Sequence, residues 1–305
     1  MNTKDYACVF YYTDDRYDEL AKCAINSFKK YNGNEVDVYN INYKNKKSYD
    51  DSLSYYEVGE ETFLMQYIYA YEIMKKYNYK KVMILGCDTI TCSRLDEFLD
   101  DNSCDAFGTL NYPCVEETEY WKSPVLQVGI DQNNNPIYDV LNINADVICF
   151  NNPDTLKLTI DLSIEHYGYF SIQGGINEIV FNKLKNIKVV DFPYHSSKVV
   201  YNARSKGVFG TDMIYKGMYK KHGPPLDGTP SPIQKWKVID NKLYTSDNKQ
   251  IKVWHYIEGL GGRPIEKFKE LIDDFKFNWF NKETIEFFKN ECDCVEFFEK
   301  EYIIK

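Results

Sequence analysis

The stretch KVMILGCD, residues 81–88, indicates the fold more strongly than any other part of the sequence. Val82–Leu85 is a continuous apolar run, which is typical of a central strand covered on both faces. Gly86 and Cys87 end the run, and Asp88 follows at the carboxyl end of the predicted strand. Open α/β sheets bind their ligands at that edge, so Asp88 is the first candidate site residue.

The segments before this strand predict a parallel sheet covered by helices. Tyr6–Tyr12 and Val36–Ile41 are short, apolar and β-branched or aromatic, and predict two more strands. Between them we expect a helix that begins after residues 13–15, ends at Asn32-Gly33 and buries one face formed by Leu20, Cys23, Ala24 and Phe28. A strand, a helix and a strand in this order favour a parallel sheet.

The remaining segments continue this pattern, with less regular parts between them. Residues 111–140 are rich in Pro and Asn and predict loops with an inserted hairpin, and residues 201–235 predict a long loop. Residues 238–256 alternate like strands around a turn at 246–248. The other predicted elements are helices over Glu60–Tyr77, 95–99, Asp154–Tyr167 and Gln173–Leu184, and strands over Asp105–Leu110, Asn144–Phe150 and Ile187–Phe192.

Length and composition predict one α/β domain with an appendage. The chain has 305 residues, and 44% of them are hydrophobic, which is enough for a large core and excludes the composition of a disordered chain. We expect the domain to span residues 1–264, with residues 265–305 forming a helical segment docked on it. The apolar residues at helical spacing in that segment are Phe268, Ile272, Phe275, Ile285, Phe288 and Phe298.

The charge balance argues against nucleic acid as the main partner. The net charge is −9 at pH 7 and the sequence pI is about 5.1, whereas proteins that grip phosphate backbones carry the opposite balance. Lys and Arg are scattered, and the longest basic runs are pairs. These cations are therefore expected on solvated surface.

The cysteines and the N-terminus predict a cytoplasmic protein without a membrane span. Nine cysteines cannot all pair within one chain, and no CxxC pair is followed by a second pair, so free thiols are expected. The start MNTKDYACVFYY lacks the apolar core of a secretory signal, and no run is long enough to cross a bilayer.

Two segments carry residue types suited to a metal and a diphosphate. Asp88 is placed to hold a divalent cation, because hard cations prefer oxygen ligands and neutralise a leaving diphosphate; the alternative is a helix cap before Thr89. His255 follows the predicted strand end, and the glycine-rich stretch after it offers backbone N–H groups to an anion. The alternatives there are a structural histidine and a simple turn.

Two further segments have polar residues at the ends of predicted elements. Gln173-Gly174-Gly175-Ile176-Asn177 lies before a predicted helix, and its alternative is a plain turn and helix start. Asn144-Ala145-Asp146 opens a predicted strand, and its alternative is a satisfied buried polar cluster.

In order, these segments resemble the retaining GT-A glycosyltransferases of family 8, the group of glycogenin and the bacterial lipopolysaccharide galactosyltransferases. VFYYTDDRYDELAKCAINSF resembles the opening strand, turn and helix, and VMILGCDTITCSRLDEFLD resembles the Asp-x-Asp strand and the helix after it. Asn144–Asn151 resembles the Phe-Asn-x-Gly-Val strand. Gln173–Asn177 resembles the Asp-Gln-Asp-x-Leu-Asn segment, and residues 255–264 resemble the His-x-x-Gly-x-x-Lys-Pro element.

The resemblance implies a fold, ligands and roles. It implies a GT-A, Rossmann-like α/β fold with a mixed, mostly parallel sheet flanked by helices. The uridine of a UDP-sugar would lie at Thr13, Asp14 and Tyr17. Mn²⁺ or Mg²⁺ would be held by Asp88 and His255. The residues implied around the diphosphate are Gly259, Gly262 and Arg263, and those around the sugar are Asn144, Asp146 and Gln173.

The sequence departs from the family pattern at functional positions. Gly86 stands where the first Asp of Asp-x-Asp is expected, which removes one metal ligand and its charge. Ile172 stands in place of the Asp before Gln173, and the loop after His255 is two residues longer. Arg263 replaces Lys, and its planar fork suits a phosphate at least as well.

The function expected from these residues is transfer of a hexose from a UDP-sugar to a hydroxyl of a glycan or protein, with retention. Residues 111–140 and 201–235 are the expected acceptor walls. The open alternatives are a non-catalytic nucleotide-sugar-binding protein, which Gly86 motivates, and a self-glycosylating enzyme like glycogenin, which the 27 tyrosines permit. A nucleotidyltransferase and a metal hydrolase fit the motifs less well.

Overall fold

The computed structural model of the protein describes a large part of the predicted α/β domain and a few residues of the C-terminal segment. The described residues are 4–12, 17–42, 64–87, 89–110, 125–130, 136–140, 143–167, 172–190, 237–244, 248 and 250–255, with Glu283, Glu286, Phe287 and Asn290.

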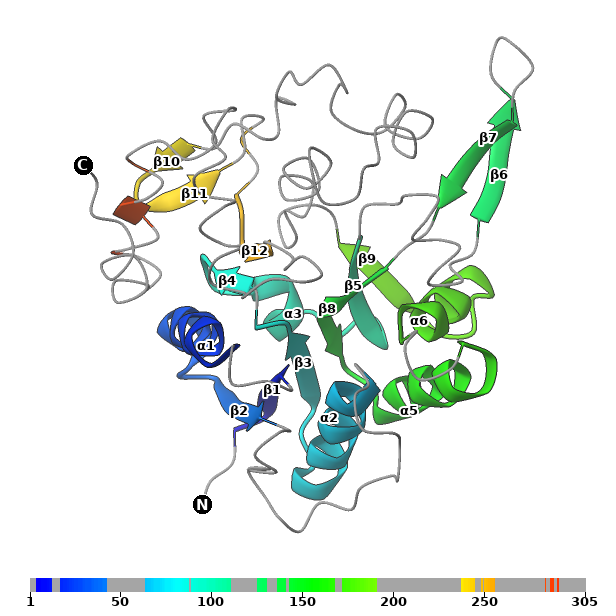
Figure 1. The fold of residues 1–305 in the computed structure, drawn as a ribbon, viewed down its shortest axis with the longest axis horizontal. Coiled ribbons are helices and arrows are strands. Elements are labelled where there is room, and N and C mark those ends of the chain that lie inside the picture. Colours follow the sequence, from blue (N-terminus) through cyan, green and yellow to red (C-terminus); the bar gives the residue numbers. More distant parts are fainter. Residues whose placement is uncertain are drawn as a thin grey trace.

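A six-stranded mixed sheet forms the centre of the described part, in the order β2-β1-β3-β8-β5-β9 (Figure 1). Five strands run parallel to one another, and β8 runs antiparallel to both of its neighbours, β3 and β5. The mostly parallel α/β fold expected from the sequence is therefore confirmed. The strand bounds are β1 Tyr6–Tyr12, β2 Val36–Asn42, β3 Lys81–Leu85, β5 Ala106–Leu110, β8 Ile143–Phe150 and β9 Ile187–Val190.

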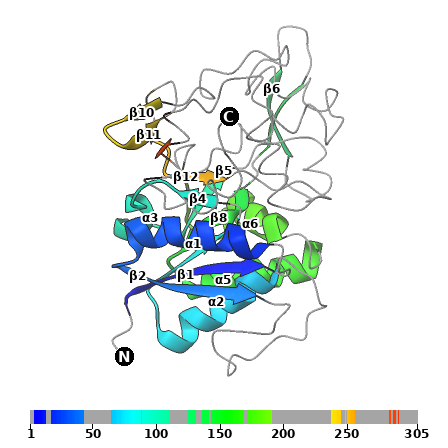
Figure 2. The ribbon, with the colours of Figure 1, turned by 60° about the vertical axis from the view of Figure 1, so that its left-hand side comes forward.

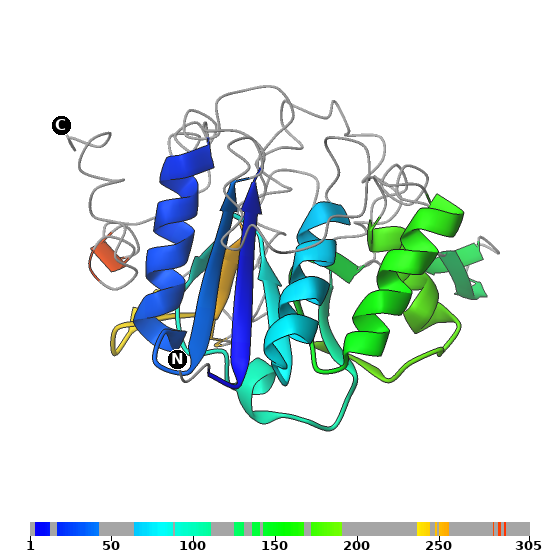
Figure 3. The same ribbon diagram turned by 90° about the horizontal axis from the view of Figure 1, so that it is seen from below.

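Helices cover both faces of this sheet, as Figures 2 and 3 show. On one face, α1 and α3 bury a cluster, the α1-side core, that includes Phe28, Leu99 and the β3 side chains Met83 and Leu85. On the other face, α2, α5 and α6 bury a second cluster, the α2-side core, which includes Ile84 of the same strand. The helix bounds are α1 Asp18–Asn32, α2 Leu64–Tyr77, α3 Asp96–Asp100, α5 Pro153–Leu162 and α6 Ile172–Phe181, with a single π-turn at Ser163–Tyr167.

The sequence pattern explains these elements directly. All five residues of β3 are buried, because neighbouring strands flank it and a helical layer covers each face. The face of α1 predicted from its spacing is buried, and the helix ends where Gly33 donates its N–H to the carbonyl of Lys29. At the start of α5, Asn152 caps the helix by accepting a hydrogen bond from the N–H of Asp154.

Two small antiparallel ladders differ from the sequence prediction. The strands β10 (Lys237–Ile239) and β11 (Lys242–Tyr244) join through Asp240-Asn241, both with positive φ, so this hairpin has a turn that the prediction at 246–248 missed. Strand β4 (Thr89–Thr91), which no pattern indicated, pairs with β12 (Val253–His255). The predicted inserted hairpin is present as β6 (Val125–Ile130) and β7 (Pro136–Val140), which project from the sheet in Figure 1.

The C-terminal segment is described at four residues, and one of them, Asn290, contacts α1. The Phe287 side chain is buried, and Lys30 of α1 donates a hydrogen bond to the carbonyl of Asn290 at 3.0 Å. The apolar residues on which docking was predicted lie outside the described residues, so the division at residue 264 stays a prediction.

The expectation that all cysteines are free thiols is wrong at Cys23. This residue of α1 is disulfide-bonded, and its partner lies outside the described residues. The other cysteines of the described part are free and buried: Cys8, Cys87, Cys92, Cys104 and Cys149. Spacing cannot reveal a pair of this kind, because the fold alone brings distant thiols together. Among the helices of the described residues, none is long and apolar enough to cross a membrane.

Candidate functional site at the carboxyl edge of the sheet

The carboxyl edge of the sheet brings three of the predicted site segments together. β3 ends at Leu85, and the N–H of Gly86 donates a hydrogen bond to the carbonyl of Asp146 at 2.9 Å. Asp146 lies in the first part of β8. This strand runs antiparallel to β3 and pairs Val147 with Leu85. The segment 144–146 therefore lies beside the strand end that precedes Asp88.

The β4–β12 ladder brings His255 to the same place. Its register pairs His255 with Thr89, the residue that follows Asp88 in the chain. Asp88 and the His255 side chain lie outside the described residues. The register nevertheless joins two segments that are far apart in the sequence.

An ion-paired lysine anchors β12 next to its histidine. Lys252 has a side chain that is 11% exposed, and its ammonium lies 2.8 Å from an oxygen of Asp96 and 2.9 Å from one of Glu97. Both carboxylates belong to the first turn of α3. The carbonyl of Lys252 also accepts a hydrogen bond from the N–H of Cys92. Sequence reasoning missed this residue, because nothing local marks a lysine that pairs across the fold.

The start of β8 is a bulge with its polar groups satisfied. Gly108 pairs with Ile148 but Leu110 pairs with Ile143, so β8 carries extra residues between these two pairs. The Asn144 side chain, which is 3% exposed, accepts the N–H of Asp146 at 2.8 Å. This agrees with the alternative interpretation of Asn144 as part of a satisfied buried cluster, and leaves its predicted contact with the sugar as a proposal.

Neighbouring elements fix the rest of the bulge. The hydroxyl of Tyr67 in α2 donates to the carbonyl of Ala145 at 2.7 Å, and the Thr109 hydroxyl donates to that of Val147 at 2.9 Å. The side chain of Asn177 in α6 accepts the N–H of Ile143 at 2.7 Å. Tyr67 and Thr109 were not predicted as site residues, and only the tertiary structure identifies them.

The segment 173–177 lies inside α6 rather than before it. The helix begins at Ile172, so Gln173 is in its first turn and the glycine pair is helical. A Cβ at Gly175 would lie 2.6 Å from the carbonyl oxygen of Thr159, so this position lets α6 approach the end of α5 closely. The Gln173 side chain lies outside the described part, and its role stays a prediction.

Polar groups gather at the ends of β1 and β2, beside the predicted uridine turn. Burial and a hydrogen bond to Asp18 raise the pKa of Tyr12 to about 12. The Asn42 amide lies 3.4 Å from the same carboxylate. Tyr17 precedes α1 and packs against the α1-side core. Thr13 and Asp14 lie outside the described residues, as do Gly259, Gly262 and Arg263.

The residues predicted at this edge fit a divalent cation in their chemistry. Asp88 offers oxygen and His255 offers nitrogen, a combination that suits Mn²⁺ and is tolerated by Mg²⁺. The register places the backbone of His255 beside Thr89, the residue after Asp88 in the sequence. Among the described residues, no three His, Cys, Asp or Glu side chains cluster in a way that could hold a metal ion.

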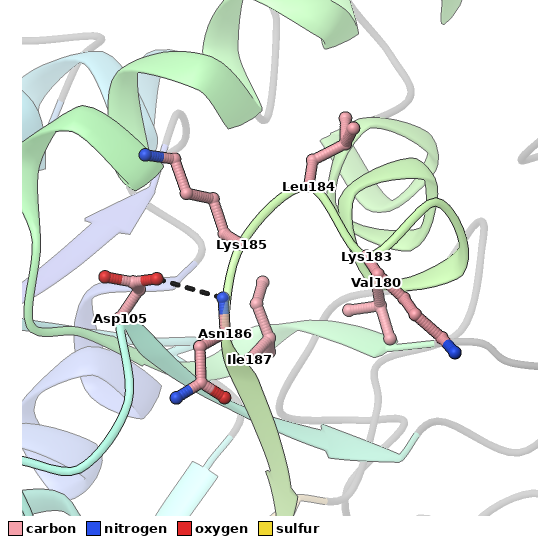
Figure 4. Close-up of a pocket in the computed structure, with 7 residues that line it drawn as sticks. All are labelled: Asp105, Val180, Lys183, Leu184, Lys185, Asn186 and Ile187. Atoms are coloured by element: carbon pink, nitrogen blue, oxygen red, sulfur yellow. Dashed lines mark hydrogen bonds between the residues drawn. The ribbon is translucent and has the colours of Figure 1, made fainter.

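A surface pocket at the other end of the sheet is not part of this site. Asp105 and Asn186 lie in it, just before the amino ends of β5 and β9. Figure 4 shows the Asp105 carboxylate accepting the N–H of Asn186 at 2.9 Å. The other Asp105 oxygen accepts from Asn152, so this carboxylate fixes a turn of the backbone.

No protein-family model matches the sequence, and no curated protein matches it. Solved glycosyltransferase structures are similar in fold. The apo form of GlyE from Streptococcus pneumoniae TIGR4 is 14% identical with a TM-score of 0.43, and the alignment covers 98% of this chain and 64% of that chain. A glycosyltransferase involved in the glycosylation of the major capsid of PBCV-1 is 11% identical with a TM-score of 0.43, over 88% of this chain and 98% of that one.

The galactosyltransferase LgtC, solved with donor and acceptor sugar analogs, is 12% identical with a TM-score of 0.41, over 92% of this chain and 99% of that one. All three TM-scores lie below 0.5. For that reason we base the function on the residues of this chain.

Proposed function

We propose that the protein is a GT-A glycosyltransferase that moves a hexose from a UDP-sugar to a hydroxyl of a glycan or protein, with help from Mn²⁺ or Mg²⁺. The pairing of His255 with Thr89 is the observation that carries the proposal. It supports a shared site for the two predicted metal ligands, because His255 pairs with the residue that follows Asp88, at the carboxyl edge of a mostly parallel sheet, where such sheets bind ligands. The order of the motifs in the sequence agrees with the strand register in the structure. A chance match to the motifs would not be expected to show this agreement.

The donor would lie along this edge from β1 to β8. Uridine would bind at Thr13, Asp14 and Tyr17, and the partly buried Tyr17 ring supplies an apolar surface for a base. Gly259, Gly262 and Arg263 would provide backbone N–H groups and a guanidinium for the diphosphate.

When bound, the cation supplies charge that stabilises the leaving diphosphate. Asp88 and His255 would hold it there. Asn144, Asp146 and Gln173 would orient the sugar as its anomeric carbon gains positive character. Retention of configuration follows from the family resemblance, and Asp146 is the carboxylate near the sugar to test as a base or nucleophile.

The first experiment measures release of uridine diphosphate from a panel of UDP-sugars, with Mn²⁺ and with chelator. We expect slow hydrolysis of one donor that is lost with chelator and falls at least about a hundredfold in Asp88→Asn. Asp161→Asn is a matched control, because Asp161 pairs with Lys157 on the exposed side of α5. Absence of both donor binding and release in the unmodified protein would exclude the proposal.

Gly86 favours a second candidate, a nucleotide-sugar-binding protein without turnover. This candidate predicts saturable binding of one UDP-sugar with no release of uridine diphosphate at any Mn²⁺ concentration, also when glycan and protein acceptors are present. Intact mass after incubation with donor tests self-glycosylation in the same samples, since transfer to the chain adds hexose units.

A further inference from the structure

Position 86 and Asp146 face each other across two strands at the candidate site. Val147 pairs with Leu85, and the hydrogen bond from the Gly86 N–H to the Asp146 carbonyl extends this ladder by one residue. Cα atoms of residues directly opposite in an antiparallel pair are about 4.5–5.5 Å apart. Glycine contributes no side chain, so Asp146 supplies the carboxylate at this point of the edge.

Position 86 belongs to the α2 side of the sheet, the side on which Ala145 is buried. Leu85 and Val147 belong to the α1-side core, whereas Ile84 and Ile148 belong to the α2-side core. Side chains alternate along strands, so position 86, which lies between Leu85 and Cys87 of the α1-side core, belongs to the α2 side, and Ala145 next to Asp146 packs in the α2-side core.

Tyr67 connects the α2-side core to the segment that contains Asp146. Its ring is buried in the α2-side core, and its pKa is raised by burial first and then by the negative charge of Asp146. The Tyr67 hydroxyl also donates a hydrogen bond to the carbonyl of Ala145, the residue before Asp146.

The bulge holds the backbone of Asp146 at both polar groups. Its N–H is accepted by the Asn144 side chain and its carbonyl accepts the N–H of Gly86. Bulges of this kind re-aim a side chain at the end of a strand. A rigid backbone suits a residue that must hold a ligand in place.

We propose that Asp146 is a ligand of the divalent cation and replaces the carboxylate missing at position 86. The inference rests on the proposed function and deepens it by completing the donor set of Asp88 and His255. The sequence motifs agree with an exchange of positions, because Asp146 stands where the Phe-Asn-x-Gly-Val pattern has Gly, and Gly86 stands where Asp-x-Asp has Asp.

The test moves the carboxylate from one strand to the other. Mn²⁺ binding is measured by the electron paramagnetic resonance signal of free Mn²⁺, with metal alone and with uridine diphosphate. We expect Asp146→Asn to weaken Mn²⁺ binding at least about tenfold, and Gly86→Asp/Asp146→Asn to recover most of that loss, since affinity follows the number of charged ligands. Asp161→Asn is expected to bind like the unmodified protein.

Circular dichroism and urea unfolding establish that each variant is folded. If the double variant does not fold, Asp146→Asn alone decides, because Asn keeps the shape of Asp. Unchanged Mn²⁺ affinity in folded Asp146→Asn would overturn the inference, even if turnover fell. A loss of turnover without a loss of Mn²⁺ affinity would indicate that Asp146 acts as a base or contacts the sugar. No Mn²⁺ binding by the unmodified protein, with or without uridine diphosphate, would also overturn it.

The same measurements separate this inference from the proposed function. Mn²⁺ binding that depends on Asp146, in a protein that binds and cleaves no UDP-sugar, would support the site and exclude glycosyl transfer. Metal-dependent donor cleavage with unchanged Mn²⁺ binding in Asp146→Asn would support glycosyl transfer and exclude this ligand.

Discussion

Gly175 in α6 lies where the helix meets the end of α5. A Cβ there would be 2.3 Å from the Ser163 hydroxyl and 2.6 Å from the carbonyl oxygen of Thr159. The carbonyl belongs to the α5 backbone and cannot rotate away. The absence of a side chain at residue 175 therefore sets the position of the helix that carries Gln173 and Asn177.

We predict that Gly175→Ala destabilises the protein by about 1–3 kcal/mol, because α6 must move outward. Urea unfolding measures the loss. Gly108→Ala is the control, since its Cβ would meet a methyl group of Ile143 at 2.7 Å, and that side chain can turn. An equal or smaller loss in Gly175→Ala than in Gly108→Ala would contradict the prediction.

At the scale of elements, β12 pairs only with β4 among the strands that the structure describes. The Lys252 pairs with Asp96 and Glu97 attach it to α3. The Lys252 side chain is nearly buried, while the two carboxylates are about half exposed. The contribution of these ion pairs to stability is therefore expected to lie between those of surface pairs and buried pairs.

We expect Lys252→Gln to cost about 1–2 kcal/mol of stability and to raise the Mn²⁺ concentration needed for half-maximal turnover, because β12 carries His255. Lys188→Gln is the matched control, as it breaks a 2.7 Å pair with Asp101 at the other end of the sheet. Lys252→Arg should restore both properties. An unchanged Mn²⁺ requirement in Lys252→Gln would show that the pairs act on stability alone.

A second set of ion pairs links the turn before β2 to α3. Arg94 bonds Glu35 through two nitrogens at 2.8 Å and bonds Asp100 at 2.7 and 2.8 Å. The hydrogen bonds from Arg94 are the main reason why the pKa values of Glu35 and Asp100 are lowered. The folded state thus holds these carboxylates ionised more strongly than the unfolded chain does.

A lowered pKa contributes stability above the unfolded pKa, and this contribution is lost as the pH falls through the folded pKa. We predict that Arg94→Gln costs about 1 kcal/mol near neutral pH, after allowing for solvent screening. The cost should shrink toward zero as the pH falls from about 5 to about 3. Urea unfolding at several pH values measures it, and a cost independent of pH would refute the ionic explanation.

At the scale of the whole molecule, the disulfide of Cys23 ties α1 to a part of the chain outside the described residues. Cys23 is one of the residues on the buried face of α1. Lys30 on the same helix bonds Asn290, so α1 also holds part of the C-terminal segment.

We predict that reduction lowers the stability of the protein by about 2–4 kcal/mol, as loss of a native disulfide usually does. Thermal unfolding with and without reductant measures the effect. Cys23→Ser should be as unstable as the reduced protein and insensitive to reductant. Cys149→Ser is the control, because Cys149 is a free buried thiol whose pKa burial raises to about 12. Sensitivity to reductant in Cys23→Ser would place the effect at another pair.

The sequence by itself determined the layers of the fold and the order of the site segments. Continuous apolar runs such as Val82–Leu85 can be recognised in the sequence because a strand covered on both faces must be largely apolar. The buried face of α1 can be predicted from the sequence because helical spacing places its apolar residues on one side. Asp88 was a candidate because the carboxyl end of a buried strand is a local feature.

Only the tertiary structure decided which of these segments meet. The β4–β12 register, the bulge of β8 and the Gly86–Asp146 hydrogen bond each join residues from distant parts of the chain. Short strands such as Thr89–Thr91 are stabilised by their partners rather than by their own composition, so no local pattern marks them. The role of Asp146 is likewise invisible in its own segment, because it depends on a glycine across the sheet.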